Sequence, residues 1–131
     1  MRLLLDTHFL LWILTASRRL KDYPWLLKYQ PWGISPVSLL EIQFLNEIGR
    51  VEAQLPELSE QLAQDPRFCM DDLPLIDLVR AGITLTWTRD PFDRLICAHS
   101  QARRLPLCTA DDRILQNHDW VCRELRKGGG C

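Results

Sequence analysis

The sequence predicts an α/β protein, a three-layer α/β/α sandwich around a central parallel sheet. Short, wholly apolar runs alternate along the chain with longer amphipathic stretches, a pattern typical of strands that are buried on both faces between helices. The 131 residues are enough for one domain with its own core, and neither a repeat nor a linker divides them. We therefore expect a single domain over residues 1–127 with right-handed crossovers, followed by a flexible tail at 128–131.

Six short segments carry the strand pattern. They are apolar or β-branched, and polar residues, proline or glycine bound them. The helical stretches between them favour a parallel arrangement, since each strand must return to the same end of the sheet. In chain order the expected strands lie at residues 3–5, around Ile34, and at 67–70, 84–87, 105–109 and about 120–123.

Six amphipathic segments are expected to form the helices. Gly49 and Gly82 end two of them, because glycine favours the position just past a helix end. Glu57 supports a helix that begins at Pro56, since an acid in the first turn is favourable there. The helices are expected at residues 7–14, 36 to about 48, 56 to about 64, 75–81, from 91 onward, and 112–117.

Acidic residues follow two of the expected strands. In open parallel sheets, ligands bind beyond the carboxyl ends of the strands. Asp6 follows the first strand, while Asp111 and Asp112 follow the strand at 105–109. An aspartate at these places can also be the N-cap of the next helix, so Asp6 could have a purely structural role. Of Asp111 and Asp112, only one is needed as a cap.

Glu41 lies within an amphipathic helix. Its helical neighbours Val37, Phe44 and Leu45 are expected to face the core. A carboxylate on an apolar face is costly unless it is paired or bound to a cation. We therefore expect either a metal ion or a buried arginine beside Glu41.

The stretch RDPFDR contains two aspartates three residues apart. Asp90 at the N-cap would place Pro91 at the first helical position, where its fixed φ is harmless, and Asp93 at the third, as in a capping box. Both acids could thus serve only to begin a helix. Asp93, however, has Ile96 and Cys97 at i+3 and i+4, so it should also lie on the inward face.

Four acids, Asp6, Glu41, Asp93 and Asp111, are expected to converge on one edge of the sheet. Like charges this close raise one another's pKa, and a hard divalent cation removes the conflict. Oxygen-rich sites select Mg²⁺ or Mn²⁺ over zinc, and the three histidines show no zinc-ligand spacing. With no P-loop, G-x-G-x-x-G or G-x-S-x-G motif present, such a site indicates phosphodiester hydrolysis by a metal-activated water.

Composition limits the possible partners and location. The net charge of −1 argues against nucleic-acid binding through overall basicity. An odd number of widely spaced cysteines indicates reduced thiols in the cytoplasm, and no apolar run is long enough to span a membrane. Contacts with RNA would need local groups of cations, of which there are three: Arg18, Arg19 and Lys21; Arg103 and Arg104; Arg123, Arg126 and Lys127.

The motifs LLLDTHFLLW, SPVSLLEI, RDPFDRLICAHS and LCTADDRIL together resemble the PIN-domain family, specifically the VapC-like toxin nucleases of type II toxin-antitoxin systems. The resemblance extends from residue 1 to about 121. It implies a Mg²⁺- or Mn²⁺-dependent endoribonuclease, usually a homodimer, that a small cognate antitoxin holds inactive.

The resemblance also implies roles for individual residues. The four acids of the family fall on Asp6, Glu41, Asp93 and Asp111. Many relatives of this branch carry a histidine just before RDPFDR, where this chain has Thr88. Residues expected to support the acids are Thr7, Ser38, Thr109 and Asp112.

Two other functions remain open from the sequence. A phosphatase of the haloacid-dehalogenase type also places an aspartate after its first strand, but its acid/base aspartate two residues later is His8 here. A PIN-like domain used only for assembly would not need a complete set of acids. The placement of the four carboxylates should therefore distinguish the metal-dependent nuclease from these two alternatives.

Overall fold

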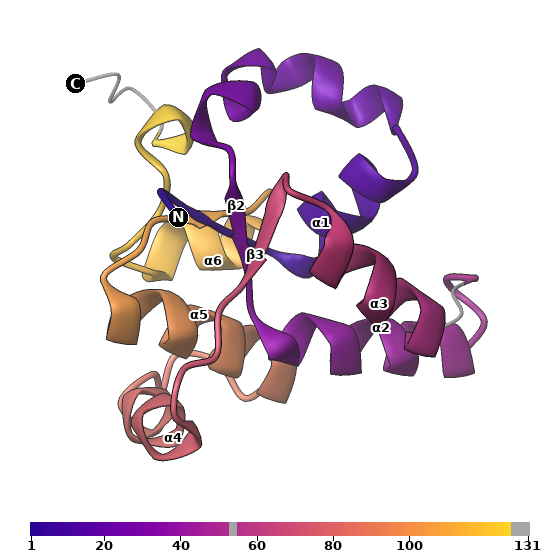
Figure 1. The fold of residues 1–131 in the computed structure, drawn as a ribbon. Coiled ribbons are helices and arrows are strands. Elements are labelled where there is room, and N and C mark those ends of the chain that lie inside the picture. Colours follow the sequence, from indigo (N-terminus) through magenta and orange to yellow (C-terminus); the bar gives the residue numbers. More distant parts are fainter. Residues whose placement is uncertain (53–54, 127–131) are drawn as a thin grey trace.

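A computed structural model of the chain describes residues 1–52 and 55–126 (Figure 1). The tail expected at 128–131 lies outside the described residues. Four strands form one parallel sheet in the order β3-β2-β1-β4. They are β1 (Leu4–Leu5), β2 (Trp32–Ile34), β3 (Phe68–Met70) and β4 (Leu107–Cys108).

The helices cover both faces of this sheet, which confirms the three-layer α/β/α sandwich. One core cluster joins Leu3 and Leu5 to α1, α2 and α3, and the other joins Leu4 and Leu107 to α4, α5 and α6. Successive residues of β1 thus point to opposite layers, as expected of a strand buried on both faces. The helices are α1 (Thr7–Leu14), α2 (Pro36–Glu47), α3 (Leu55–Gln64), α4 (Leu75–Ile83), α5 (Pro91–Arg103) and α6 (Asp112–Asn117).

Two expected strands are wrong. Residues 84–87 form a turn after α4, in which the Leu85 N–H donates to the Gly82 carbonyl and the Thr84 hydroxyl donates to the Ala81 carbonyl. Its β-branched residues suggested a strand, but local hydrogen bonds satisfy the backbone instead. In the segment at 120–123, only Val121 pairs with the sheet, as a parallel bridge to Leu107.

No element was predicted for residues 18–29, which form two 3₁₀ helices, η1 (Arg18–Asp22) and η2 (Pro24–Tyr29). They lie over one end of the first core cluster (Figure 1). Aromatic rings hold them there, because Tyr23 packs edge-on against Phe9 at 4.8 Å between centroids and Trp25 packs against Tyr23 at 6.1 Å. Within the part of the chain that the structure describes, no helix is long and apolar enough to cross a membrane.

Candidate active site

The four predicted acids come from four elements that meet at the carboxyl edge of the sheet. Asp6 directly follows β1, and Asp111 follows β4 after two residues. These strands are neighbours, and the Asp6 N–H donates to the Cys108 carbonyl at 2.9 Å. Glu41 lies on α2 and Asp93 on the first turn of α5, two helices that pack against each other.

Asp6 is buried, and both of its carboxylate oxygens have partners. Oδ1 accepts the Thr7 N–H at 2.7 Å, so Asp6 does cap α1, and Oδ2 accepts the Thr109 hydroxyl at 2.7 Å. Burial raises the pKa of Asp6, while the bonds from Thr109 and Thr7 lower it and the charge of Asp111 raises it further. The structural and the site role therefore coexist, and Thr7 and Thr109 both contact Asp6 as expected.

Glu41 is half-buried, and its Oε1 is shielded from solvent without a hydrogen-bond partner. The arginine considered as its partner does not appear, since Glu41 forms no ion pair within the described residues. Burial raises the pKa of Glu41; a bond from Thr7 opposes this, and the charge of Asp6 adds to it. Thr7 Oγ1 also lies 3.1 Å from Ser38 Oγ.

One expectation about Glu41 is wrong. Phe44, taken as a core residue, is 44% exposed and packs on Phe92 of α5 at 5.5 Å between ring centroids. Leu45 is buried as expected. Glu41 consequently lies on a face of α2 that is only partly buried in the core and that also packs on α5.

The two aspartates of RDPFDR have different contacts in the structure. Asp90 Oδ1 accepts the N–H groups of Phe92 and Asp93 at 2.9 and 3.2 Å, so Asp90 is the N-cap. The reciprocal bond of a capping box is absent among the described residues, because the Asp90 N–H donates to the Thr88 hydroxyl instead, at 3.2 Å. Thr88, which stands where many relatives have histidine, is buried in this role.

Among the residues that the structure describes, none donates a hydrogen bond to the Asp93 carboxylate, and the pKa of this group reflects its surroundings. Burial and the charges of Asp90, Asp6, Asp111 and Glu41, in that order, raise the pKa of Asp93 to about 7. Its helical neighbours Ile96 and Cys97 are fully buried, as expected. A cation near Asp93 would offset both burial and the charges of the neighbouring acids.

Asp111 is exposed and is itself the N-cap of α6. Its Oδ1 accepts the N–H groups of Arg113 and Ile114 at 2.9 and 3.1 Å, and its own N–H donates to Thr109. Asp112 is exposed in the first turn. The sequence left open which of the two acids is the cap, and the structure assigns it to the predicted site residue.

Whether these residues suit a divalent ion can be tested from their donors. Residues 1–52 and 55–126 contain no three acid, histidine or cysteine side chains near enough to enclose an ion as they stand. The donors nevertheless fit a hard cation, because they are all carboxylates and Glu41 Oε1 has no partner in the described part of the chain.

One residue near the acids was missed from the sequence as a possible functional group. His8 is exposed in the first turn of α1, and its charge lowers the pKa of both Asp6 and Glu41. The only signal for it was its position two residues after Asp6.

A second polar group at the same edge of the sheet was also missed. His99 is buried on α5, with Nδ1 at 2.9 Å from Ser35 Oγ and Nε2 at 2.7 Å from Asp71 Oδ2. Arg103 Nε donates to the same Asp71 oxygen at 2.8 Å. Arg103 and His99 together hold the pKa of Asp71 below its usual value against the effect of burial. We call Ser35, His99, Asp71 and Arg103 the buried polar network.

His118 is a buried histidine whose neutral form is required. Ser100 Oγ donates to the Leu105 carbonyl at 2.6 Å, so His118 Nε2 must be the donor in its 2.9 Å contact with that oxygen. Nδ1 is then an acceptor with no partner in the described part of the chain. Burial lowers the pKa of His118 to about 4.

The lowered pKa of His118 predicts a stability loss in acid. Below about pH 6.5 the unfolded chain binds this proton and the folded chain does not, so stability falls until about pH 4. Between pH 7.5 and 5, wild type should lose about 2 kcal/mol more than His118→Gln, measured by urea unfolding at each pH. Gln116→Asn, a neutral change at an exposed position on α6, the helix that ends just before His118, supplies the control and should follow wild type. Equal losses in His118→Gln and wild type would contradict the assignment.

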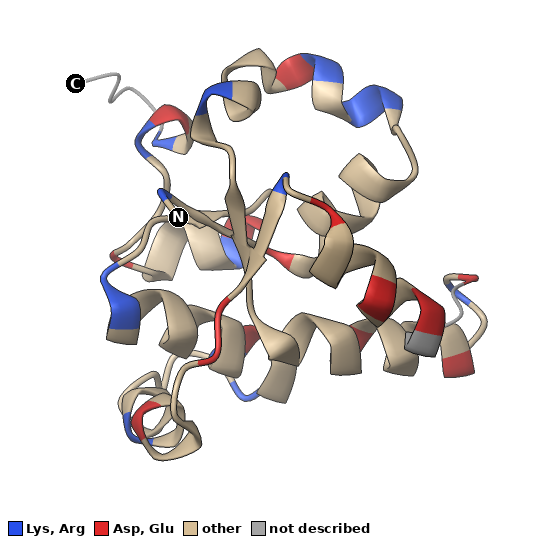
Figure 2. Cartoon of the chain, viewed as in Figure 1, with Lys and Arg blue, Asp and Glu red and all other residues tan. Residues whose placement is uncertain are grey.

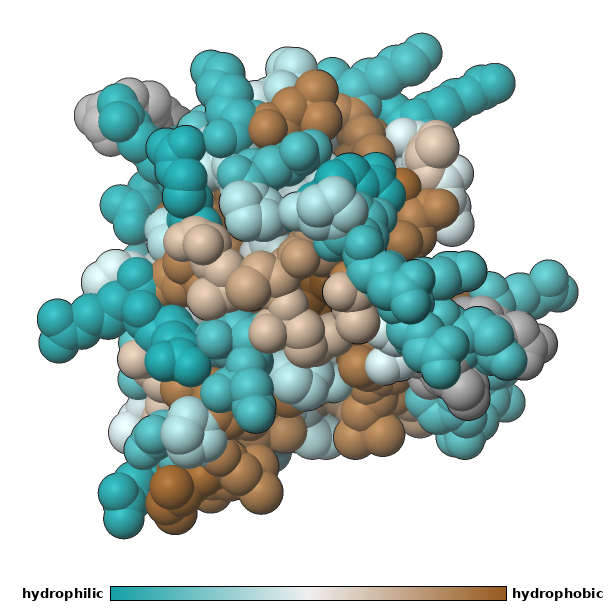
Figure 3. All heavy atoms as spheres, in the orientation of Figure 1, coloured by the Kyte–Doolittle hydropathy of each residue, from teal (hydrophilic) through white to brown (hydrophobic). Residues whose placement is uncertain are grey.

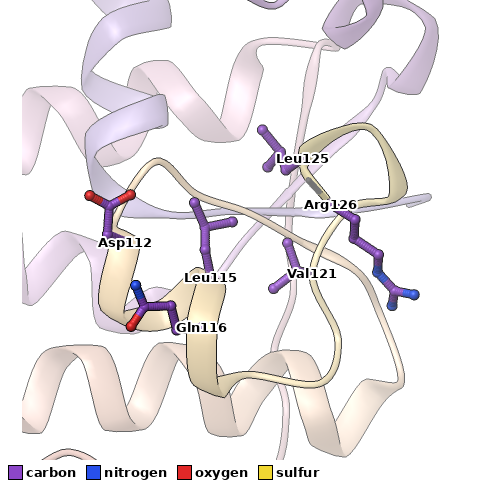
Figure 4. A pocket seen from close by; sticks show the side chains of 6 residues that line it. All are labelled: Asp112, Leu115, Gln116, Val121, Leu125 and Arg126. Carbon is purple, nitrogen blue, oxygen red and sulfur yellow. The ribbon is translucent and has the colours of Figure 1, made fainter. Parts of the chain in front are cut away.

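A hollow of about 230 Å³ lies away from the acids, over α6 and the C-terminal segment (Figure 4). It is lined mainly by Leu115, Val121 and Leu125, with Asp112 at its edge. Asp112 is thus the only predicted site residue that borders it. The hollow has no part in the carboxylate site.

The basic groups predicted from the sequence are not one surface. Lys and Arg are scattered over separate elements in the view of Figure 2. Arg103 pairs with Asp71, and Arg19 lies over the Trp12 ring at 5.3 Å. Lys127 lies outside the described residues.

Comparisons with known proteins agree with this architecture. The PIN domain family profile matches residues 3–120, and the chain belongs to this family. A solved structure described as a toxin-antitoxin complex from Klebsiella pneumoniae superposes with a TM-score of 0.65 at 19% identity, covering 92% of this chain and 95% of that chain. This similarity shows a shared fold. No curated protein sequence gives a significant match.

Proposed function

We propose that this protein is a divalent-metal-dependent endoribonuclease that hydrolyses RNA phosphodiesters at Asp6, Glu41, Asp93 and Asp111. The observation that carries the proposal is the setting of Asp93, where burial first, and then the charges of Asp90, Asp6, Asp111 and Glu41, raise its pKa to about 7. PIN domains are generally nucleases, which supports a hydrolase. The alternative of a non-catalytic assembly module gives no reason for an unpaired Glu41 and an unbonded Asp93 at one edge.

Each residue has a definable task in this reaction. Mg²⁺ or Mn²⁺ would supply a water of lowered pKa and neutralise charge on the leaving oxygen. The hydroxyl of Thr109 fixes the carboxylate of Asp6 at 2.7 Å, and that of Thr7 links α1 to Ser38 on α2. Within the described residues, Glu41 Oε1 has no hydrogen-bond partner, so this oxygen is available to an ion.

Ion binding should be measurable without substrate. Without a metal ion, the folded protein keeps four carboxylates near one another at a cost in stability. Saturating Mg²⁺ or Mn²⁺ should therefore raise the melting temperature of wild type by several degrees. Glu41→Gln should reduce this rise by at least half in differential scanning calorimetry. Glu47→Gln, an exposed acid on the same helix, should not change it. A rise of equal size in Glu41→Gln would show that the ions bind elsewhere.

The reaction itself is tested by incubating the protein with labelled single-stranded RNA. Cleavage should occur with Mg²⁺ or Mn²⁺, stop with EDTA and yield internal fragments. A protein that cleaves neither RNA nor any other phosphodiester, with all four acids intact, would contradict the proposal. Trapping of a phosphate on Asp6 would instead favour the phosphatase alternative.

We further propose that the protein is a VapC-like toxin with a small cognate antitoxin. The solved structure that shares its fold is a toxin-antitoxin complex, and the similarity covers nearly the whole of both chains. Cytoplasmic RNA would be its substrate, which agrees with the free thiols of Cys69, Cys97, Cys108 and Cys122. A short neighbouring reading frame whose product abolishes RNA cleavage would support this role.

A homodimer is expected for this class, and α4 offers the surface for it. Leu75, Ile76, Val79 and Ile83 are 72%, 55%, 41% and 65% exposed. They form the hydrophobic area over α4 at the lower left of Figure 3. A solvent-exposed apolar helix face of this kind indicates a protein contact. In a dimer with two-fold symmetry, the α4 face of each subunit would cover that of the other.

Breaking this face should separate the subunits. Ile83→Asp buries a charge in the proposed contact and should convert dimer to monomer in light scattering coupled to gel filtration. Leu27→Asp changes an equally exposed leucine, 69% accessible on η2, and should leave the mass unchanged. A dimer that persists in Ile83→Asp would place the contact on another face.

A further inference from the structure

A hollow of about 440 Å³ lies beside the acids and is lined by Thr86, Trp87, Arg89, Asp90 and Arg113. It is joined to the carboxylate site on two sides. Asp90 caps the helix that carries Asp93, and the Arg113 N–H donates to Asp111 Oδ1 at 2.9 Å. The hollow therefore adjoins the beginnings of α5 and α6, the segments that carry Asp93 and Asp111.

The two arginines of this hollow are placed differently. Arg113 Nη2 donates to the Trp87 carbonyl at 2.7 Å, which fixes its guanidinium at the wall of the hollow. Arg89 is exposed, and within the described residues it forms neither a hydrogen bond nor an ion pair. One guanidinium is thus pre-positioned and the other is free to close on a ligand.

The remaining arginines of the adjoining helix are committed elsewhere. Arg94 Nε donates to the Gly82 carbonyl at 2.7 Å, which ties α5 to the end of α4. Arg103 is bound to Asp71. The second arginine of RDPFDR is therefore structural, while the first faces the hollow.

Charge determines what this hollow can hold. The carboxyl group of Asp90, also on its wall, accepts two backbone N–H groups at the start of α5, where the helix dipole offsets part of its charge. Two guanidinium groups then leave a net positive charge next to four acids. A polyanion approaching those acids is repelled by them, so it needs cations at this point.

We infer that this hollow binds the nucleotide next to the scissile phosphodiester of an RNA strand, with Arg89 and Arg113 on its phosphate. The inference rests on the proposed function, since it takes RNA as the ligand. Guanidinium groups bind phosphate oxygens in pairs, and the volume lies in the range of pockets that hold small organic ligands. The partly buried indole of Trp87, packed against the second core cluster, supplies a rigid wall.

The test measures binding rather than cleavage. Asp93→Asn protein, full length and in Mg²⁺, is titrated into a fluorescein-labelled single-stranded RNA of about ten nucleotides, and anisotropy is recorded over a series of salt concentrations. Adding Arg89→Gln should weaken binding about tenfold at low salt. It should also flatten the slope of log K against log salt by about 0.7, the value for one lost phosphate contact on a single strand.

Matched variants make the result specific. Arg80→Gln removes the same charge from an exposed position on α4 and should leave the binding and slope of the Asp93→Asn protein unchanged. Arg113→Lys keeps the positive charge but cannot donate a pair of bonds to one phosphate. Its RNA affinity should lie between those of Arg89→Gln and Arg80→Gln. Arg89 has no structural bond, so its replacement should not alter the melting temperature.

Two results would overturn the inference. If Arg89→Gln bound RNA as tightly as its parent protein, the hollow would not be part of the RNA-binding site. The nuclease proposal would remain intact. A parent protein that binds no RNA would exclude RNA as the ligand of the hollow. In that case, cleavage of single-stranded DNA by wild type would show that the catalytic proposal survives with a different substrate.

Discussion

Asp93→Asn should abolish RNA cleavage and at the same time make the metal-free protein more stable. The loss of activity follows because the site would retain three of its four carboxylates. The stability gain follows because Asp93 is ionised against burial and four neighbouring acids, with its pKa raised from 3.8 to about 7. Allowing for partial exposure, we expect a gain of about 2 kcal/mol at pH 8 in EDTA.

The pH dependence of this gain has a definite sign. A carboxyl group whose folded pKa is raised destabilises the fold above that pKa, and the penalty disappears as pH falls toward the unfolded value. The difference between Asp93→Asn and wild type should therefore shrink between pH 7 and pH 4. Urea unfolding at several pH values, with RNA cleavage assayed in parallel, measures both effects.

Asp90→Asn is the matched control, three residues away in the same motif. Asparagine caps helices nearly as well as aspartate, so this variant should lose about 1 kcal/mol or less and keep much of its activity. If Asp90→Asn were inactive and Asp93→Asn active, the two roles would have been assigned in reverse. A destabilised Asp93→Asn protein would contradict the electrostatic account of the site.

Asp71→Ala should lower stability by about 3 kcal/mol without removing the nuclease activity of the folded protein. Asp71 accepts bonds from His99 and Arg103 within the buried polar network. Its removal leaves His99 Nε2, on a side chain that is 1% exposed, without a partner. Thermal and urea unfolding measure the loss, and cleavage is assayed well below the melting temperature.

Asp72→Ala is the neighbouring control. Asp72 is exposed, and only its backbone carbonyl accepts a bond, from Arg103. Its replacement should change stability by less than about 0.5 kcal/mol. If Asp71→Ala were folded but inactive, the buried polar network would have a role in the reaction as well as in stability.

The sequence predicted the acids of the site because each has a local signature. Asp6 follows an apolar strand, and a 3.6-residue period distinguishes Asp93, with Ile96 and Cys97 behind it, from Asp90. The same periodicity was wrong for Phe44, because a helix at the rim of a sandwich places part of its apolar stripe on a neighbouring helix rather than in the core.

The buried polar network could not be predicted in the same way. Ser35 and His99 are 64 residues apart, and His99 and Asp71 are 28 apart. No local pattern links such residues, since only the crossovers between parallel strands bring them together. The strand expected at 84–87 was wrong for a related reason, because β-branched residues indicate a strand only where a neighbouring strand is available.

The pairing of β1 with β4 has a consequence for the time at which the site is formed. The hydroxyl of Thr109 reaches back 103 residues to hold Asp6, and Asp111 is still further along the chain. A nascent chain on the ribosome therefore cannot possess the complete candidate site until residue 111 has emerged. Contacts of such long sequence separation also form slowly. With this topology, the proposed activity would be absent while the first 110 residues are being made.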